Sequence, residues 1–249
     1  MGKFNVAHIT DTGKTHTNNE DALVADEQKG IFIVADGLGG HNAGEIASQI
    51  AVNTLPDLIY RNIKNEKKPK EIKPLICAAI VEVHKDILRQ AKDNKNKADM
   101  GTTVVIAAFH NERLFIANVG DSRAYIVRDG TIAQVSKDDT YVADLVKTRR
   151  IRPEEAINHP QKNQVTQALG GKQKISPHVT EIGFSNDDTL LLCSDGLTEH
   201  VSDNKILTKI NDNKNLKEAA SALINLANDR GGTDNITLIL IRRDNESSC

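Results

Sequence analysis

Two hydrophobic runs in this chain end in the same way, in an aspartate followed by a glycine. Residues 31–35 (IFIVA) lead into Asp36 and Gly37, and residues 190–194 (LLLCS) lead into Asp195 and Gly196. Each run is short, apolar and bounded by a turn signal, which predicts a buried strand. The glycine lets the chain turn sharply, so each carboxylate is expected at the end of a strand.

Two further aspartates stand at comparable places. Asp121 follows the apolar run over residues 114–119, and Asp234 precedes the apolar run over residues 236–241. A single aspartate at a strand end is an ordinary turn residue, but four of them beside glycines and apolar strands indicate one shared acidic cluster. Such a cluster repels itself unless cations hold it together, so the pattern predicts a metal site.

The order of the expected elements favours an α+β fold with a central β-sandwich. Short connections between strands dominate, which is typical of antiparallel sheets. The helices come in blocks instead of alternating with strands, which argues against a doubly wound parallel sheet. Strands are expected over residues 4–10, 22–25, 31–35, 102–109, 114–119, 123–127, 132–135, 177–183, 189–194 and 236–241, and helices over about 45–55, 73–91 and 216–228.

Residues 138–169 interrupt this pattern. The segment is polar and basic, with short helical patterns at 141–148 and 153–158. A polar insertion of this length between strands is typical of a lid or substrate-binding flap. The lysine-rich stretch over residues 64–73 is broken by acidic residues and a proline, and we interpret it as a solvated loop.

Composition argues against several classes of function. The formal net charge of −2 gives no electrostatic case for binding nucleic acid. No apolar run is long enough to span a bilayer, and the first residues lack the apolar core of a signal peptide. The three cysteines include no Cys-x-x-Cys pair, which indicates a reducing compartment. We therefore expect a soluble, cytoplasmic protein with neither nucleic acid nor a membrane as partner.

The candidate metal ligands are all oxygen donors. Carboxylates without His or Cys at zinc spacing favour Mg²⁺ or Mn²⁺ over Zn²⁺. If Asp36 bridges two ions about 4 Å apart, a water between them loses its proton easily and becomes a nucleophile, for which a phosphate ester is a natural electrophile. The carboxylates considered are Glu20, Asp21, Asp36, Asp121, Asp195 and Asp234, and the backbone carbonyl of Gly37 is a further candidate.

Eight short motifs follow one another along almost the whole chain, from about residue 4 to 241. They are residues 10–13 (TDTG), 19–21 (NED), 36–41 (DGLGGH), 101–103 (GTT), 119–125 (VGDSRAY), 168–170 (ALG), 194–197 (SDGL) and 234–237 (DNIT). Each motif alone is weak, but the ordered series resembles the metal-dependent serine/threonine protein phosphatases of type 2C (PPM). The bacterial stand-alone branch of that family is the nearest match.

The resemblance implies a β-sandwich of two antiparallel sheets flanked by helix pairs. It implies one catalytic domain over residues 1–243, with a flap at about 138–169 and a disordered tail over 244–249. Two ions, Mn²⁺ or Mg²⁺, would bind at one end of the sandwich, and a third, weaker ion beside them. By this likeness Asp36 bridges two ions, Asp195 and Asp234 complete the coordination of one of them, and Gly37 binds the other through its carbonyl. Glu20 and Asp21 act through metal-bound waters, and Asp121 with Asp195 holds the third ion.

The chain departs from the family pattern at His16. Members usually place an arginine there to hold the substrate phosphate, and Lys14 is a candidate to compensate. Arginine is a permanently charged fork, whereas histidine is charged only part of the time near neutral pH. We therefore expect weaker phosphate binding and a lower pH optimum. Leu38 stands where animal relatives carry a histidine assigned as general acid, so the proton donor is unassigned.

These features predict a Mg²⁺- or Mn²⁺-dependent enzyme of bacterial signalling that hydrolyses phosphoserine and phosphothreonine on proteins. Asp36, Asp195 and Asp234 are the predicted catalytic set, with direct attack by metal-bound hydroxide and no phosphoenzyme. The resemblance implies a serine/threonine kinase and its targets as partners, and we expect a monomer. Two alternatives stay open, a pseudophosphatase that only binds phosphoproteins and a metal-dependent hydrolase of small phosphoesters. His41 is interpreted as structural, and Arg123 as either an ion-pair partner or a phosphate contact.

Overall fold

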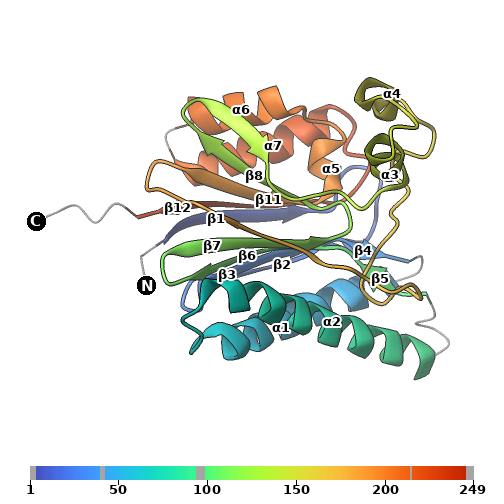
Figure 1. The fold of residues 1–249 in the computed structure, drawn as a ribbon. Coiled ribbons are helices and arrows are strands. Elements are labelled where there is room, and N and C mark those ends of the chain that lie inside the picture. The colour runs from blue at the N-terminus through green and yellow to red at the C-terminus, as the bar shows by residue number, and fades with distance from the viewer. Residues whose placement is uncertain (1–3, 40–42, 94–98, 214, 245–249) are drawn as a thin grey trace, which may run out of the picture.

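The computed structural model describes residues 4–39, 43–93, 99–213 and 215–244. The expectations for His41 and for the tail after Asp244 lie outside these residues. The described chain forms two five-stranded sheets, stacked face to face (Figure 1), in which all paired strands are antiparallel.

The two sheets draw their strands from distant parts of the sequence. The first sheet has the order β1 (Phe4–Asp11), β12 (Ile236–Arg243), β11 (Thr189–Cys193), β8 (Arg123–Arg128) and β9 (Thr131–Gln134). The second has the order β10 (His178–Ile182), β7 (Arg113–Val119), β6 (Val104–His110), β3 (Ile31–Ala35) and β2 (Ala22–Asp26). A small ribbon of β4 (Gly37–Leu38) and β5 (Gly101–Thr102) lies at one end.

Helices cover the outer face of each sheet, as Figure 1 shows. The second sheet carries α1 (Ala43–Ile63) and α2 (Pro69–Asp93), and the first carries α6 (Asp203–Asp212) and α7 (Leu216–Asp229). The short helix α5 (Asp195–Thr198) follows β11 directly. Residues 138–169, which we call the flap segment, contain α3 (Tyr141–Lys147) and α4 (Pro153–Ile157).

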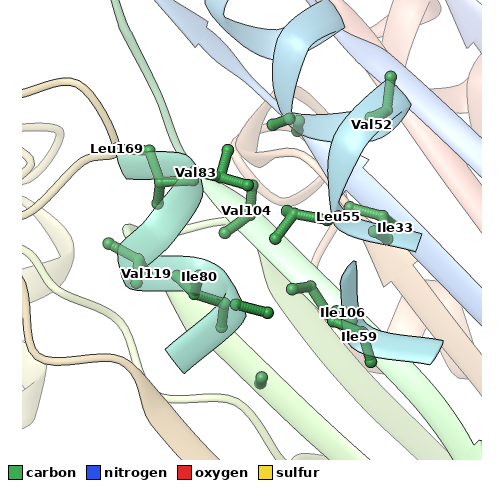
Figure 2. Close-up of a cluster of buried hydrophobic side chains, with 14 of the residues drawn as sticks. Ile33, Val52, Leu55, Ile59, Ile80, Val83, Val104, Ile106, Val119 and Leu169 are labelled. Carbon is green, nitrogen blue, oxygen red and sulfur yellow. The ribbon is translucent and has the colours of Figure 1, made fainter. Parts of the chain in front are cut away.

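Both faces of the central strands are buried, which explains why these strands are continuous apolar runs. In β3, Ile31 and Ile33 pack against the α1–α2 pair, whereas Phe32 and Val34 pack against the opposite sheet. Successive side chains of a strand point to opposite faces, so a sandwich flanked by helices needs apolar residues at every position. Figure 2 shows the helix side of this core, where Ile33 lies beside Leu55 of α1.

Besides the four-residue helix α5, which was not expected, three helical segments differ from the sequence-based prediction. α1 continues through Pro56 to Ile63, and α2 begins at Pro69, so the second half of the stretch 64–73 is helical and not loop. α6 was missed because its sequence is mostly polar. Its buried side chains, Ile206 and Ile210, are spaced one helical turn apart and are the signal that could have revealed it.

The strand register brings distant residues to one end of the sandwich. Asp11, the last residue of β1, pairs with Ile236, the first residue of β12, and Cys193 ends β11 beside the same part of β12. In the second sheet, Ala22 at the start of β2 pairs with Ala35 at the end of β3. The β4–β5 ribbon and the flap segment lie at this same end (Figure 1). The carboxylates next to these strand ends therefore converge.

Candidate metal centre

Asp36 lies at the centre of the acidic cluster. Its backbone is fixed where β3 leaves the sheet, since the Thr103 N–H and the Thr102 hydroxyl donate to Asp36 O at 2.8 and 2.9 Å. Burial raises the pKa of Asp36 well above its ordinary value, and repulsion by neighbouring carboxylates raises it further. Those neighbours are Asp21, Asp195, Asp121 and Asp234.

Asp21 connects the two sheets at this end. Its Oδ2 accepts a hydrogen bond from the Ser194 hydroxyl at 2.7 Å, and Ser194 Oγ in turn accepts from the Thr237 N–H at 3.0 Å. Burial raises the pKa of Asp21 to about 8, although hydrogen bonds from Ser194 and Thr237 oppose that rise. Repulsion by Asp195 and Asp234 adds to it. The start of β2 is thus tied to β11 and β12 through a buried carboxyl group.

Asp195 and Asp121 form the side of the cluster nearest the flap segment. Burial raises the pKa of Asp195 to about 6 and that of Asp121 to about 8, and repulsion by Asp195 adds to the latter. Asp195 Oδ1 is buried and accepts no hydrogen bond from any described residue. A buried carboxylate oxygen without a donor is costly, so this atom marks a place for a cation or an ordered water.

A close approach of backbone at Gly44 brings Glu20 beside Gly37. A Cβ atom on Gly44 would lie 2.1 Å from Glu20 Oε2 and 2.9 Å from the Gly37 carbonyl oxygen. Only glycine fits there, and the two oxygens consequently face the same small space. Burial raises the pKa of Glu20, an effect that His16 opposes and Asp234 reinforces.

The two residues predicted to bind phosphate lie differently with respect to the cluster. His16 Nε2 is 3.6 Å from Asp234 Oδ1, and both side chains are about half exposed, so the imidazole stands at the rim. Lys14 is also exposed, and its backbone N–H donates to Gly232 O at 2.7 Å. Among the described residues, no hydrogen bond or ion pair joins the Lys14 ammonium group to the cluster. The structure therefore brings His16, but not Lys14, to the carboxylates.

Asn235 was not singled out from the sequence, although it holds the first loop in place. Its Oδ1 accepts from the Glu20 N–H at 2.8 Å, and its Nδ2 donates to Thr12 O at 2.9 Å and to Asn18 O at 3.1 Å. Gly13 packs against the same turn, and its φ of +76° and close approach to Asp234 O require glycine. The Asp-Asn pair that opens β12 was the available signal.

Arg123 is an ion-pair partner in this structure. Its Nε and Nη2 contact Asp138 Oδ2 at 3.0 and 2.6 Å, and its Nη1 donates to the Tyr125 hydroxyl at 3.1 Å. The guanidinium group is thereby committed to the start of the flap segment. Of the two roles considered from the sequence, the geometry supports the ion pair.

The donor set fits a hard divalent cation. All candidate ligands are oxygens, Asp195 Oδ1 lacks a donor, and buried like charges are stabilised by a positive ion. In the described part of the chain, no three His, Cys, Asp or Glu side chains are already grouped closely enough to hold an ion. Binding would therefore require these carboxylates to lose protons and move closer together, with the backbone carbonyl of Gly37 adding a ligand.

An acidic, all-oxygen cluster at one end of a helix-flanked β-sandwich is typical of a metal-dependent hydrolase. Comparison with known proteins agrees: the family model described as "Protein phosphatase 2C" matches residues 5–236. The serine/threonine phosphatase stp of Listeria monocytogenes is 39% identical over 238 residues, 94% of each chain. The chain therefore belongs to the protein phosphatase 2C family, and the predicted family, enzyme class and fold are confirmed.

Solved structures agree with this assignment. The Streptococcus agalactiae serine/threonine phosphatase superposes with a TM-score of 0.89 at 34% identity, over 97% of this chain and 100% of that one. The catalytic domain of the phosphatase PstP, solved with two manganese ions, gives 0.84 at 35% identity over 97% and 99%. These likenesses support dependence on Mn²⁺ or Mg²⁺. No helix within the described residues is both long and apolar enough to cross a membrane.

Proposed function

We propose that this chain removes phosphate from phosphoserine and phosphothreonine of proteins, using two divalent cations held by the acidic cluster. The observation that carries the proposal is the gathering of five mutually repelling carboxylates, from both sheets, at one end of the sandwich. Leaving the charges of the buried members of this group unpaired costs several kcal/mol, so the arrangement makes sense with cations present. Membership of the family supports the reaction class.

The roles follow the positions of the side chains. We assign to Asp36 the role of the residue that would hold both cations, because it is buried and each of the other four aspartates repels it and raises its pKa. Asp195 and Asp234 would complete the coordination of one cation, and the Gly37 carbonyl would bind the other. Glu20 and Asp21 would hold water molecules coordinated to the cations. Cations bound there would lower the pKa of a coordinated water and polarise a phosphoryl oxygen of the substrate.

Two finer assignments belong to this proposal. His16 at the rim contacts the substrate phosphate, with Lys14 as a more distant cation on the same loop. Asp121 and Asp195 hold a third, weaker ion, since both face the cavity beneath the flap segment. Residues 1–243 are proposed to form one catalytic domain that acts as a monomer in the cytoplasm. A serine/threonine kinase and its targets are the proposed partners.

The test is hydrolysis of p-nitrophenyl phosphate and of a phosphothreonine peptide with Mn²⁺ present. Asp36→Asn is expected to lower kcat/KM by at least about 10³-fold, because the cation contribution amounts to several kcal/mol of transition-state stabilisation. A chelator should abolish activity, and Mn²⁺ should restore it. Asp187→Asn is the matched control, since Asp187 is exposed in the turn before β11.

The alternatives predict other outcomes. A binding module would retain phosphopeptide affinity without turnover in the wild type, and only the replacement of the usual arginine by His16 favours it. A hydrolase of small phosphoesters would turn over p-nitrophenyl phosphate but not the peptide. Full activity of Asp36→Asn would contradict the proposed role of the cluster.

A further inference from the structure

A cavity of about 850 Å³ lies between the acidic cluster and the flap segment. We call it the flap cavity. Asp121 and Asp195 line one end, and the apolar side chains of Val142, Val146 and Ile157 line the flap end. A volume of this size is typical of small-molecule sites and exceeds what one phosphate group needs. The cavity thus extends the candidate active site under the flap segment.

Ile157 stands out on this surface. Its side chain is 67% exposed, and no other large hydrophobic residue in the described part of the chain is exposed. It ends α4, a helix that buries none of its residues. A single exposed apolar residue needs no explanation by itself, but this one lies on the wall of a cavity with apolar neighbours. The combination indicates a surface that is completed by an apolar group from elsewhere.

The two walls of the flap end are held differently. α3 is anchored, because Val142 and Leu145 are buried and the Thr140 hydroxyl accepts from the Ala143 N–H at its first turn. α4 buries none of its residues; it contacts α3, and the residues after it are held by the Tyr141–His159 ring contact and by the Asn163 amide, which donates to the Glu199 carboxylate beside α5. The side chain of Ile157 at its end is therefore available to an occupant of the cavity.

Charged side chains line both ends of the flap cavity. Its inner end carries the carboxylates of Asp121 and Asp195, which suit cations and, through them, a phosphate group. Its flap end adds three exposed lysines, Lys137, Lys147 and Lys162, but Glu199 also lines the cavity, and Arg123 is paired with Asp138. Charges of both signs therefore offset one another there, whereas an apolar side chain can pack against the aliphatic wall of Val142, Val146 and Ile157.

We propose that the flap cavity binds an apolar side chain of the phosphoprotein substrate, close in sequence to the residue that carries the phosphate. This inference rests on the proposed function and adds a substrate class, namely phosphoproteins with an aliphatic residue beside the phosphorylation site. The phosphate enters at the acidic end, and the adjoining peptide runs along the same cavity toward α4. Ile157 is a specificity-determining residue in this arrangement.

The experiment measures kcat/KM for a set of phosphothreonine peptides with Mn²⁺ bound. Each of the three positions on either side of the phosphothreonine carries Leu, Ala or Arg in turn. The wild type is expected to prefer Leu over Ala by about 10-fold at one or two positions, mainly through KM, and to gain less from Arg than from Leu, because a guanidinium group is costly to bury against an aliphatic wall. In Ile157→Ser the Leu/Ala ratio should fall to within about 2-fold of one.

Ile151→Ser is the control, because Ile151 belongs to the flap segment but does not line the cavity; it should keep the wild-type ratio. Ala156→Phe, which fills the cavity, should also remove the preference for Leu. Wild-type turnover with equal rates for Leu and Ala at every position would overturn the inference while leaving the proposed function intact. Absence of any turnover, including that of p-nitrophenyl phosphate, would instead overturn the proposed function.

Discussion

At the scale of single residues, the departure from the expected family pattern is His16 at the rim of the cluster. Its imidazole lies 3.6 Å from Asp234 Oδ1 and is about half exposed, so it can reach a phosphate group held by cations. An imidazole ring offers fewer donors than a guanidinium group and lacks its fork geometry. The residue is therefore expected to set the strength of phosphate binding.

His16→Arg is expected to lower KM for a phosphopeptide by roughly 3–10-fold, because a bidentate donor replaces a single one. The measurement is KM and kcat for one phosphopeptide with both proteins. His8→Arg, an exposed histidine of β1, is the control. Identical KM values for wild type and His16→Arg would show that His16 does not contact the phosphate.

At the scale of elements, one buried carboxylate joins both ends of the flap segment to the cluster. Asp139 Oδ1 accepts from His178 Nε2 at 2.8 Å and from Gln167 Nε2 at 2.9 Å, and its Oδ2 accepts from the Gly120 N–H at 3.1 Å. Gly120 directly precedes Asp121. Asp139 is therefore a positioning residue that couples the base of the flap to a proposed cation ligand.

Asp139→Ala should leave these donors unpaired in a buried place, at a cost of about 1–3 kcal/mol for each unpaired group. The expected results are faster hydrogen exchange in residues 138–169 and a higher KM for phosphopeptides, with a smaller effect on p-nitrophenyl phosphate. Asp144→Ala, an exposed residue of α3, is the control. Unchanged exchange in the flap segment would mean that Asp139 does not hold it.

The elements themselves were largely predictable, because their signals are local. Both flap helices were expected within about a residue of their observed limits, since Pro153 followed by two glutamates is typical of the first turn of a helix and opens α4. The Thr140 cap of α3 is a further local signal, which the prediction did not use. α6 escaped because only two of its side chains, Ile206 and Ile210, are buried. Apolar periodicity therefore found the elements that bury a wide face and missed one that buries a narrow one.

At the scale of the whole molecule, the sandwich and the acidic cluster could be anticipated, but the contacts that hold the cluster could not. Four strand-end aspartates indicate convergence, and the register of β1, β12 and β11 produces it. The link from Asp21 through Ser194 to Thr237 spans three segments that are distant in sequence. No local pattern encodes such a link, and the metal roles of these carboxylates stay predictions.

The pH dependence of metal binding follows from the buried charges. Burial and mutual repulsion hold the pKa of Asp21 and Asp121 at about 8 and that of Asp195 at about 6. Near pH 6.5 part of the cluster is therefore protonated, and these protons must leave before the oxygens can bind a cation. Affinity for Mn²⁺ should rise from pH 6 to pH 8, and binding should release protons.

The most direct test is titration calorimetry of the metal-free protein with Mn²⁺, in two buffers of different ionisation enthalpy and at several pH values. The wild type is expected to bind about two ions and to release protons. Its affinity for Mn²⁺ is expected to rise about 10-fold per pH unit for each proton that binding releases. Asp36→Asn should lose this binding, while Asp187→Asn should retain it. Absence of binding heat in the wild type, or equal binding by Asp36→Asn, would contradict the claim that these carboxylates form a metal centre.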